Sequence, residues 1–320
     1  MPQPPLEVGL TPWLFDDGNL SAGFADQAER AEALGFHSIF LPEHHFTRGA
    51  VPAPLLLLAA AAARTRTLRL GTTSYLLPLR HPLHAAAEVA VLDRISEGRV
   101  ILGVGRGFRK ATFTAFDVPV AEKRDRFETA LAAMRDAWEG KPVVATDDEP
   151  GPPAVLSPLP VQQPHPPIWL AAFGPKALAQ AGRLALPYLA SPMEPLPKLE
   201  ENLARYREAC EAAGRQPPSD VPIMRTVFVA EDVSALARVS AALESQLQAL
   251  AKTSSAALRS RVASAALEDW ALVGEPAAVR DQVAALRERF GMTHLIVRAQ
   301  IPGVDPAELE ASVDRIAALG

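Results

Sequence analysis

The segment FLPEHHF, residues 40 to 46, places one carboxylate and two imidazoles side by side directly after an apolar run. Glu43, His44 and His45 have side chains of the types used for proton transfer and for metal binding. Adjacent residues of an extended segment point in opposite directions, so His44 and His45 are not expected to bind the same ion. We therefore predict no metal site. The functional hypothesis is a catalytic cluster, and the ordinary alternative is one packed and one solvated histidine.

Two further segments could bring a ligand close to the backbone. GTTSYLLPLRHP, residues 71 to 82, begins with small residues that are typical of a local bulge. GVGRGF, residues 103 to 108, has neither the dinucleotide fingerprint nor the lysine of a P-loop. Its Arg106 suits a bidentate phosphate contact, and Arg124 at the start of the next helix could reach the same anion. Surface ion pairs are the ordinary alternative for both arginines.

These residues need a scaffold, and the apolar runs predict one. Short apolar runs alternate with segments of helical spacing, which is typical of parallel strands joined by helices. Helices are expected from Ser21 to a stop at Gly35, from Pro276 to a stop at Gly291, and after Asp305. The predicted strands are eight in number and begin at Leu6, His37, Leu68, Arg99, Pro167, Tyr188, Pro222 and Thr293.

Eight such units predict an α/β fold, a (β/α)₈ TIM barrel, forming one domain over residues 1–320. A doubly wound open sheet is the alternative. Residues 141–167 are rich in proline and are expected to form an insertion after the fourth βα unit, and residues 232–270 are expected to be helical with a break at KTSSAA. Asp93, Ser96, Gly98 and Arg99 would lie at the amino-terminal end of a strand, where a structural role is expected.

The composition excludes several classes of protein. The formal charge of −5 and the pI near 5.9 give no electrostatic basis for binding nucleic acid or an anionic membrane. The single cysteine, Cys210, excludes an internal disulfide. The amino terminus has no signal-peptide pattern, and the longest apolar stretch, residues 52–63, is too short to span a bilayer. The cytoplasm is therefore the expected compartment.

Three segments together resemble the bacterial luciferase-like family of flavin-dependent oxidoreductases, and its monooxygenases in particular. They are FLPEHHF, then LRLGTTSYLLPLRHPLHAAAEVAVLDRISEGRVILGVGRGF from residue 68, then PPIWLAAFGPKALAQAG from residue 166. The resemblance covers most of the chain. It implies the (β/α)₈ barrel, FMN that is supplied in reduced form by a separate flavin reductase, O₂ and a small organic substrate as reactants, and a homodimer.

The resemblance also assigns residues. His44 matches a family histidine near the flavin C4a position, which Glu43 would orient unless Glu43 binds neighbouring backbone; His45 is expected to be structural. Thr73 and Ser74 match a non-prolyl cis peptide behind the flavin ring. The residues implied for the cofactor site are Thr73, Ser74, Arg106, Arg124, Gly174, Lys176 and Ser191.

The sequence departs from the family pattern at three places. Gly174, Pro175 and Lys176 stand where luciferases have a phosphate-binding serine and threonine, and Gly105 stands where they have a cysteine. The segment between the seventh and eighth strands is shorter than in light-emitting enzymes. Two alternatives therefore stay open beside the FMN-dependent monooxygenase: hydride transfer with the deazaflavin F420 in the same barrel, and a flavin-binding protein without turnover.

Overall fold

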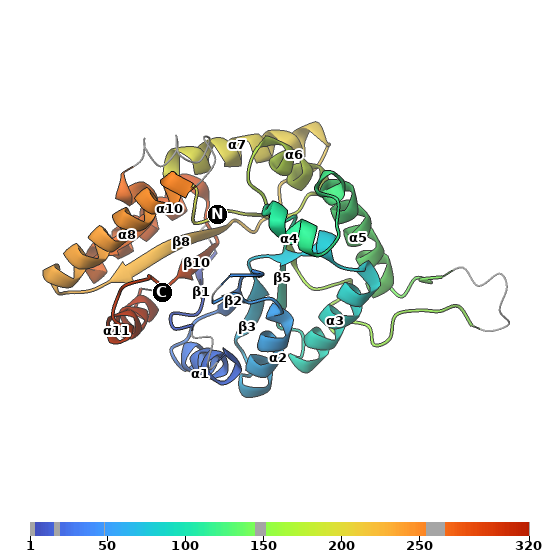
Figure 1. The fold of residues 1–320 in the computed structure, drawn as a ribbon, viewed down its shortest axis with the longest axis horizontal. Helices are drawn as coiled ribbons and strands as arrows, with labels where there is room; N and C mark the ends of the chain where they lie inside the picture. The colour runs from blue at the N-terminus through green and yellow to red at the C-terminus, as the bar shows by residue number, and fades with distance from the viewer. Residues whose placement is uncertain (1–3, 16–19, 48, 145–151, 254–265, 320) are drawn as a thin grey trace. The chain divides into compact units, whose positions relative to one another are not determined.

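The computed structural model describes residues 4–15, 20–47, 49–144, 152–253 and 266–319 of the chain. These form two compact units, with the boundary inside α1 (Leu20–Ala33) and β2 (Ser38–Leu41). We call Met1–Phe15, Arg30–Ile39 and Ala172–Gly320 the first unit, and Asp16–Glu29 and Phe40–Ala171 the second unit. The helices and strands of each unit can be followed in Figure 1.

The second unit is built on short parallel strands. Its β5 pairs with β3 (Leu70 beside Val100), with β4 (Tyr75 beside Val104) and with β6 (Leu102 beside Ile168). Its elements after β2 are α2 (Pro54–Arg64), β3 (Arg69–Thr72), β4 (Tyr75–Leu76), η1 (Leu77–Leu79), α3 (Pro82–Ile95), β5 (Val100–Gly105), α4 (Lys110–Ala115), η2 (Val120–Glu122), α5 (Lys123–Trp138) and β6 (Ile168–Ala171).

The first unit also has parallel strands, in the order β1–β10–β8–β9. The start of β2 pairs with β1, and Ala190 forms a parallel bridge to Ile223. The remaining elements are β1 (Glu7–Leu10), α6 (Pro175–Leu184), β7 (Tyr188–Leu189), α7 (Leu196–Ala212), β8 (Pro222–Val229), α8 (Val233–Thr253), η3 (Leu267–Asp269), β9 (Ala271–Gly274), α10 (Pro276–Phe290), β10 (His294–Arg298) and α11 (Pro306–Ala317). Figure 1 shows α8 and α11 alongside β8.

The parallel α/β class predicted from the apolar runs is therefore confirmed, but the list of strands needed correction. Every predicted strand segment contains a strand. The third is divided into β3 and β4, and β9 was missed. The segment ALVG forms β9 by pairing in parallel with the carboxyl-terminal half of β8.

Three predicted helix ends are confirmed by the conformation of the residues that predicted them. Gly35 and Gly291 have φ of 83° and 72°, the left-handed conformation that ends a helix, and the Asp305 side chain accepts a hydrogen bond from Ala307 N at 2.8 Å. Within the described residues, none of the helices combines the length and apolar character that crossing a membrane requires.

Two further predictions concern the proline-rich insertion and the helix break at KTSSAA. Residues 141–144 and 152–167 contain no helix or strand, and Val143 N donates to Ala154 O at 2.8 Å. Residues 145–151 and most of the KTSSAA segment lie outside the described residues; the proline-rich insertion stays a prediction.

Arg99 has the structural role that its position predicted. Its guanidinium donates to the carbonyl groups of Ala62, Thr65 and Leu68, which tie the end of α2 to the start of β5. The Asp93 carboxylate accepts from the backbone and the side chain of Gln162, at 2.9 and 2.7 Å. These contacts stabilise the amino-terminal end of β5.

Candidate active site

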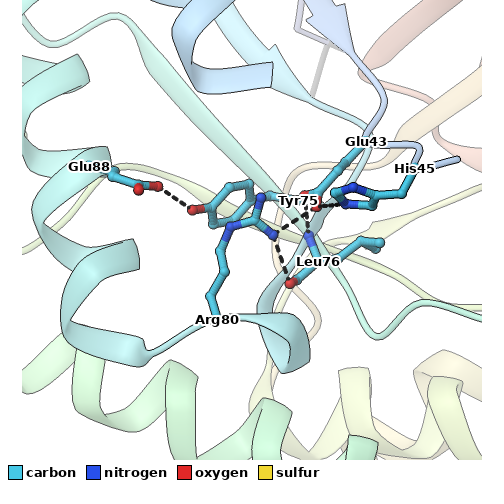
Figure 2. Close-up of polar contacts among 6 residues, drawn as sticks. All are labelled: Glu43, His45, Tyr75, Leu76, Arg80 and Glu88. Atoms are coloured by element: carbon cyan, nitrogen blue, oxygen red, sulfur yellow. Dashed lines mark hydrogen bonds and ion pairs between the residues drawn. The ribbon is translucent and has the colours of Figure 1, made fainter. Parts of the chain in front are cut away.

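Glu43 anchors the segment that follows β2. Its side chain is fully buried and accepts hydrogen bonds from His45 Nε2 at 2.6 Å, from Leu76 N at 2.9 Å and from Arg80 Nη1 at 2.8 Å. The Arg80 guanidinium lies 4.0 Å from the centre of the Tyr75 ring. Figure 2 shows these groups converging on the carboxylate. One buried anion therefore joins the EHH segment to β4 and η1.

This arrangement corrects one expectation about Glu43. The described hydrogen bonds of Glu43 come from His45, from Leu76 of β4 and from Arg80 directly after η1, and none comes from His44. The alternative expectation was that Glu43 binds backbone, and the Leu76 N–H does donate a hydrogen bond to its carboxylate. His45 is buried and contacts both Glu43, at 2.6 Å, and the Phe116 ring, whose centre lies 4.9 Å from that of the imidazole, which fits the structural role expected for it. In this structure the Glu43 carboxylate holds His45, Leu76 and Arg80, and its catalytic role stays a prediction.

His44 takes no part in the described hydrogen bonds of Glu43, and much of its surface is open to solvent although neighbouring groups partly desolvate the imidazole. Its backbone N–H donates to Val51 O at 3.0 Å, which fixes the chain on either side of it. Desolvation and the positive charge of Arg109 lower the pKa of the His44 imidazole below its ordinary value, against a smaller opposing effect of Glu43. A neutral imidazole at neutral pH can accept a proton, which is the chemistry predicted for His44.

The expected cis peptide is present between Thr73 and Ser74. Thr73 N donates to Leu41 O at 2.8 Å, and the buried Thr73 Oγ1 has no hydrogen-bond partner among the described residues. A Cβ atom on Gly105 would overlap the Ser74 hydroxyl, so Gly105 lies directly against the cis peptide. A buried hydroxyl without a partner is unfavourable unless a ligand completes it, so the bulge fits a bound polar ring.

Three cations gather where β5 ends and α5 begins. Arg106 follows β5, and Lys123 and Arg124 open α5. Desolvation and the Arg124 charge lower the pKa of Arg106, and desolvation with both arginine charges lowers the pKa of Lys123. Glu128 raises the pKa of Arg106, but by less than Arg124 lowers it. Cations that repel one another in this way form a site for an anion.

Lys123 was missed by sequence reasoning. Its Nζ donates to Gly107 O at 3.3 Å, which holds the side chain beside the glycine turn. The available signal was its place next to Arg124 in AEKRDRFETAL, but only the fold shows that it reaches the turn after β5.

The other residues assigned to the cofactor belong to the first unit. Gly174, with φ of 107°, precedes α6, and Lys176 is exposed in the first turn of that helix. Ser191 Oγ accepts from Met193 N at 3.1 Å. Arg106 and Arg124 lie in the second unit, so a shared role of these residues stays a prediction. In the described part of the chain, no cluster of three or more His, Cys, Asp or Glu side chains is arranged to hold a metal ion.

A model of the luciferase-like monooxygenase family matches residues 16–294. The chain belongs to this family. The matched region contains the EHH segment, the cis peptide and the three cations. The chain is also similar to the oxygenase component of the flavin-dependent trigonelline monooxygenase of Acinetobacter baylyi, with 29% identity over 63% of this chain and 57% of that protein. It spans about half the length of the curated relatives it matches.

Solved structures of luciferase-like monooxygenases share the fold over nearly the whole chain. Monooxygenase RslO1 from Streptomyces bottropensis is 32% identical, with a TM-score of 0.81 over 98% of both chains. The oxygenating constituent of 3,6-diketocamphane monooxygenase from Pseudomonas putida, solved with FMN, has a TM-score of 0.82 at 23% identity over 98% of this chain and 97% of that chain. F420-dependent enzymes share the fold as well. The homologues therefore include flavin-dependent monooxygenases.

Proposed function

We propose that this luciferase-like protein is an FMN-dependent monooxygenase that uses O₂ to oxygenate a small organic substrate. The observation that carries the proposal is the grouping of Arg106, Lys123 and Arg124 at the end of β5 and the start of α5, where Arg106 and Lys123 lie close enough to Arg124 for its charge to lower their pKa. The phosphate of FMN is a monoester with a charge of about −1.5 to −2 at neutral pH, as for other phosphomonoesters. A phosphomonoester of this charge suits three cations gathered in one place, which supports FMN.

The same proposal assigns the rest of the flavin site. The cis bulge at Thr73 and Ser74 would support the ring system, and the free Thr73 hydroxyl would complete its hydrogen bonding there. Gly174, Lys176 and Ser191 are proposed as further cofactor contacts. Bound reduced flavin supplies the electrons that activate O₂. His44 accepts or returns a proton beside the flavin, and Glu43 and His45 hold its backbone in place.

The fold and the partners complete the proposal. We infer a closed (β/α)₈ barrel in one domain over residues 1–320, with residues 141–167 as an insertion after the fourth βα unit. The name of the trigonelline relative, an oxygenase component, supports a separate reductase as the source of reduced FMN. We also propose the homodimer that the family resemblance implies; Leu56 on α2 and Val91 and Ile95 on α3 are exposed apolar side chains that such an interface could bury.

The phosphate assignment is tested by comparing FMN with riboflavin, which has the same ring and no phosphate. In Arg106→Gln the affinity for FMN is expected to fall about 30- to 100-fold, because a charge-assisted contact is lost, while the affinity for riboflavin stays unchanged. Lys123→Gln is expected to have a smaller effect in the same direction. Fluorescence titration of the flavin measures both affinities.

The matched control is Arg126→Gln. Arg126 lies two residues beyond Arg124, but it pairs with Glu122 at 3.6 Å and donates to Pro78 O, so FMN affinity should stay within about twofold. Equal losses of FMN and riboflavin affinity in Arg106→Gln would contradict the assignment of the phosphate to this cluster.

A further inference from the structure

The last residue of β10, Arg298, carries a charge that no described acidic side chain offsets. Its Nη1 donates to Thr226 Oγ1 at 3.2 Å and its Nη2 to Gln246 Oε1 at 3.5 Å, and both acceptors are neutral. A guanidinium has more N–H groups than these two bonds use. Burial is the only influence that shifts the pKa of Arg298, and the shift is downward. In the described part of the chain, the half-buried cation therefore has no counter-charge.

A second buried arginine, on the neighbouring strand, differs from Arg298 because an acidic side chain acts on its charge. Arg225 of β8 is 1% exposed and donates to Ser191 O and Met224 O. Burial lowers the pKa of Arg225 and the charge of Glu194 opposes this shift, while Nε and Nη2 of Arg225 have no hydrogen-bond partner among the described residues. Glu194 in turn accepts from Asn202 and Ser191 N. Arg225 belongs to a network that fixes β7 and α7. Arg298 has no comparable network.

The register places Arg298 where ligands of parallel α/β folds bind. Arg298 pairs with Thr226 in the parallel ladder, so their side chains share one face of β8 and β10, and Arg225 points to the other face. This face carries the contact to Gln246 of α8. Arg298 also ends its strand, and the carboxyl-terminal ends of parallel strands are the usual location of binding sites.

We propose that Arg298 binds a carboxylate group of the substrate. The proposal rests on the proposed function and adds the substrate class. The planar guanidinium matches the geometry of a carboxylate, and Thr226 and Gln246 orient it without neutralising it. One cation with two neutral neighbours suits a single negative charge, in contrast to the three cations gathered near Arg106.

A purely structural role makes a different prediction about stability. If Arg298 served to hold α8 through Gln246, removing the guanidinium would lower the melting temperature. If it is a binding group kept at a cost to stability, Arg298→Met removes an unbalanced, partly buried charge and leaves the melting temperature unchanged or raised. Differential scanning calorimetry of the ligand-free protein measures the melting temperature and so distinguishes the structural role from the binding role.

The binding test compares acids with their neutral amides. Benzoate with benzamide, and hexanoate with hexanamide, are titrated calorimetrically into the FMN-loaded protein. At least one acid is expected to bind about tenfold more tightly than its amide, because a charge-assisted contact is gained. Arg298→Met should abolish this difference, and Arg298→Lys should retain part of it.

The matched control is Arg238→Met. Arg238 is an exposed arginine of α8 that is already paired with Glu308 and should not affect acid binding. If neither acid is preferred by the wild type, if the preference survives in Arg298→Met, or if Arg238→Met abolishes it equally, the proposal is overturned. The FMN and riboflavin titration on the same preparations reports separately whether the proposed flavin function holds.

Discussion

Replacing His44 with asparagine is expected to slow the proton-dependent reaction of the bound reduced FMN with O₂ by about 100-fold. A positioned proton-transfer group contributes about 10²- to 10⁴-fold to a rate, and asparagine has similar size but cannot exchange a proton at neutral pH. The side chain is exposed, so the fold and the affinity for FMN should be unchanged. Rapid mixing of the protein–FMN complex with oxygenated buffer measures the rate.

The control for this variant is chemical rescue. Added imidazole should restore part of the rate in His44→Gly, because a free imidazole can occupy the vacated space and transfer the proton. A structural role for His44 would give no rescue. A rate in His44→Asn equal to that of the wild type would contradict the assignment.

The pH profile gives a second expectation for the same group. The pKa of His44 is lowered, so the neutral imidazole persists to a pH below the ordinary histidine value, and the rate should fall only below that pH. Arg109 is one cause of the lowering. Arg109→Gln removes a positive charge, raises the pKa of His44 and should move the acidic limb to higher pH. A limb that does not move would show that a different group titrates.

Replacing Glu43 with alanine is expected to lower the free energy of unfolding by about 3 to 5 kcal/mol. The change removes one partner of a buried ion pair and leaves the Arg80 guanidinium, the His45 imidazole and the Leu76 N–H without their acceptor. Urea denaturation measures the loss. Glu43→Gln keeps an acceptor oxygen and should cost less.

Glu88→Ala is the matched control for this loss. Glu88 also accepts a hydrogen bond in the group drawn in Figure 2, from the Tyr75 hydroxyl at 2.7 Å, but it is exposed. Water can replace it, so the expected cost is about 1 kcal/mol or less. Similar losses in Glu43→Ala and Glu88→Ala would contradict the anchoring role of Glu43.

Much of the fold follows from local patterns. Apolar runs predicted the strand segments, Gly35 and Gly291 predicted where two helices stop, and Asp305 predicted where a third begins. These signals act within a few residues of the chain. The strand β9 could not be recognised in this way. Its four residues carry no period of their own and depend on β8, which is more than 40 residues earlier in the sequence.

The candidate site was less accessible from the residues. The cis peptide at Thr73 was expected only through the family resemblance, because no local pattern requires it. The contact between Glu43 and His45 could have been expected from the sequence. Residues two apart on an extended segment lie on the same side, so the Glu43 side chain faces His45 and not His44. Lys123 and Arg298 depend on contacts between distant segments, which the sequence does not reveal.

The central claim, that this family member binds reduced FMN and uses it with O₂, is tested by one experiment. The protein is titrated anaerobically with reduced FMN and in parallel with reduced F420, then mixed with oxygenated buffer while flavin absorbance and oxygen uptake are recorded. The account predicts preferential binding of FMN and an oxygen reaction whose time course differs from that of free FMN and depends on His44. Preference for F420, or a time course identical to that of free reduced FMN, would contradict it.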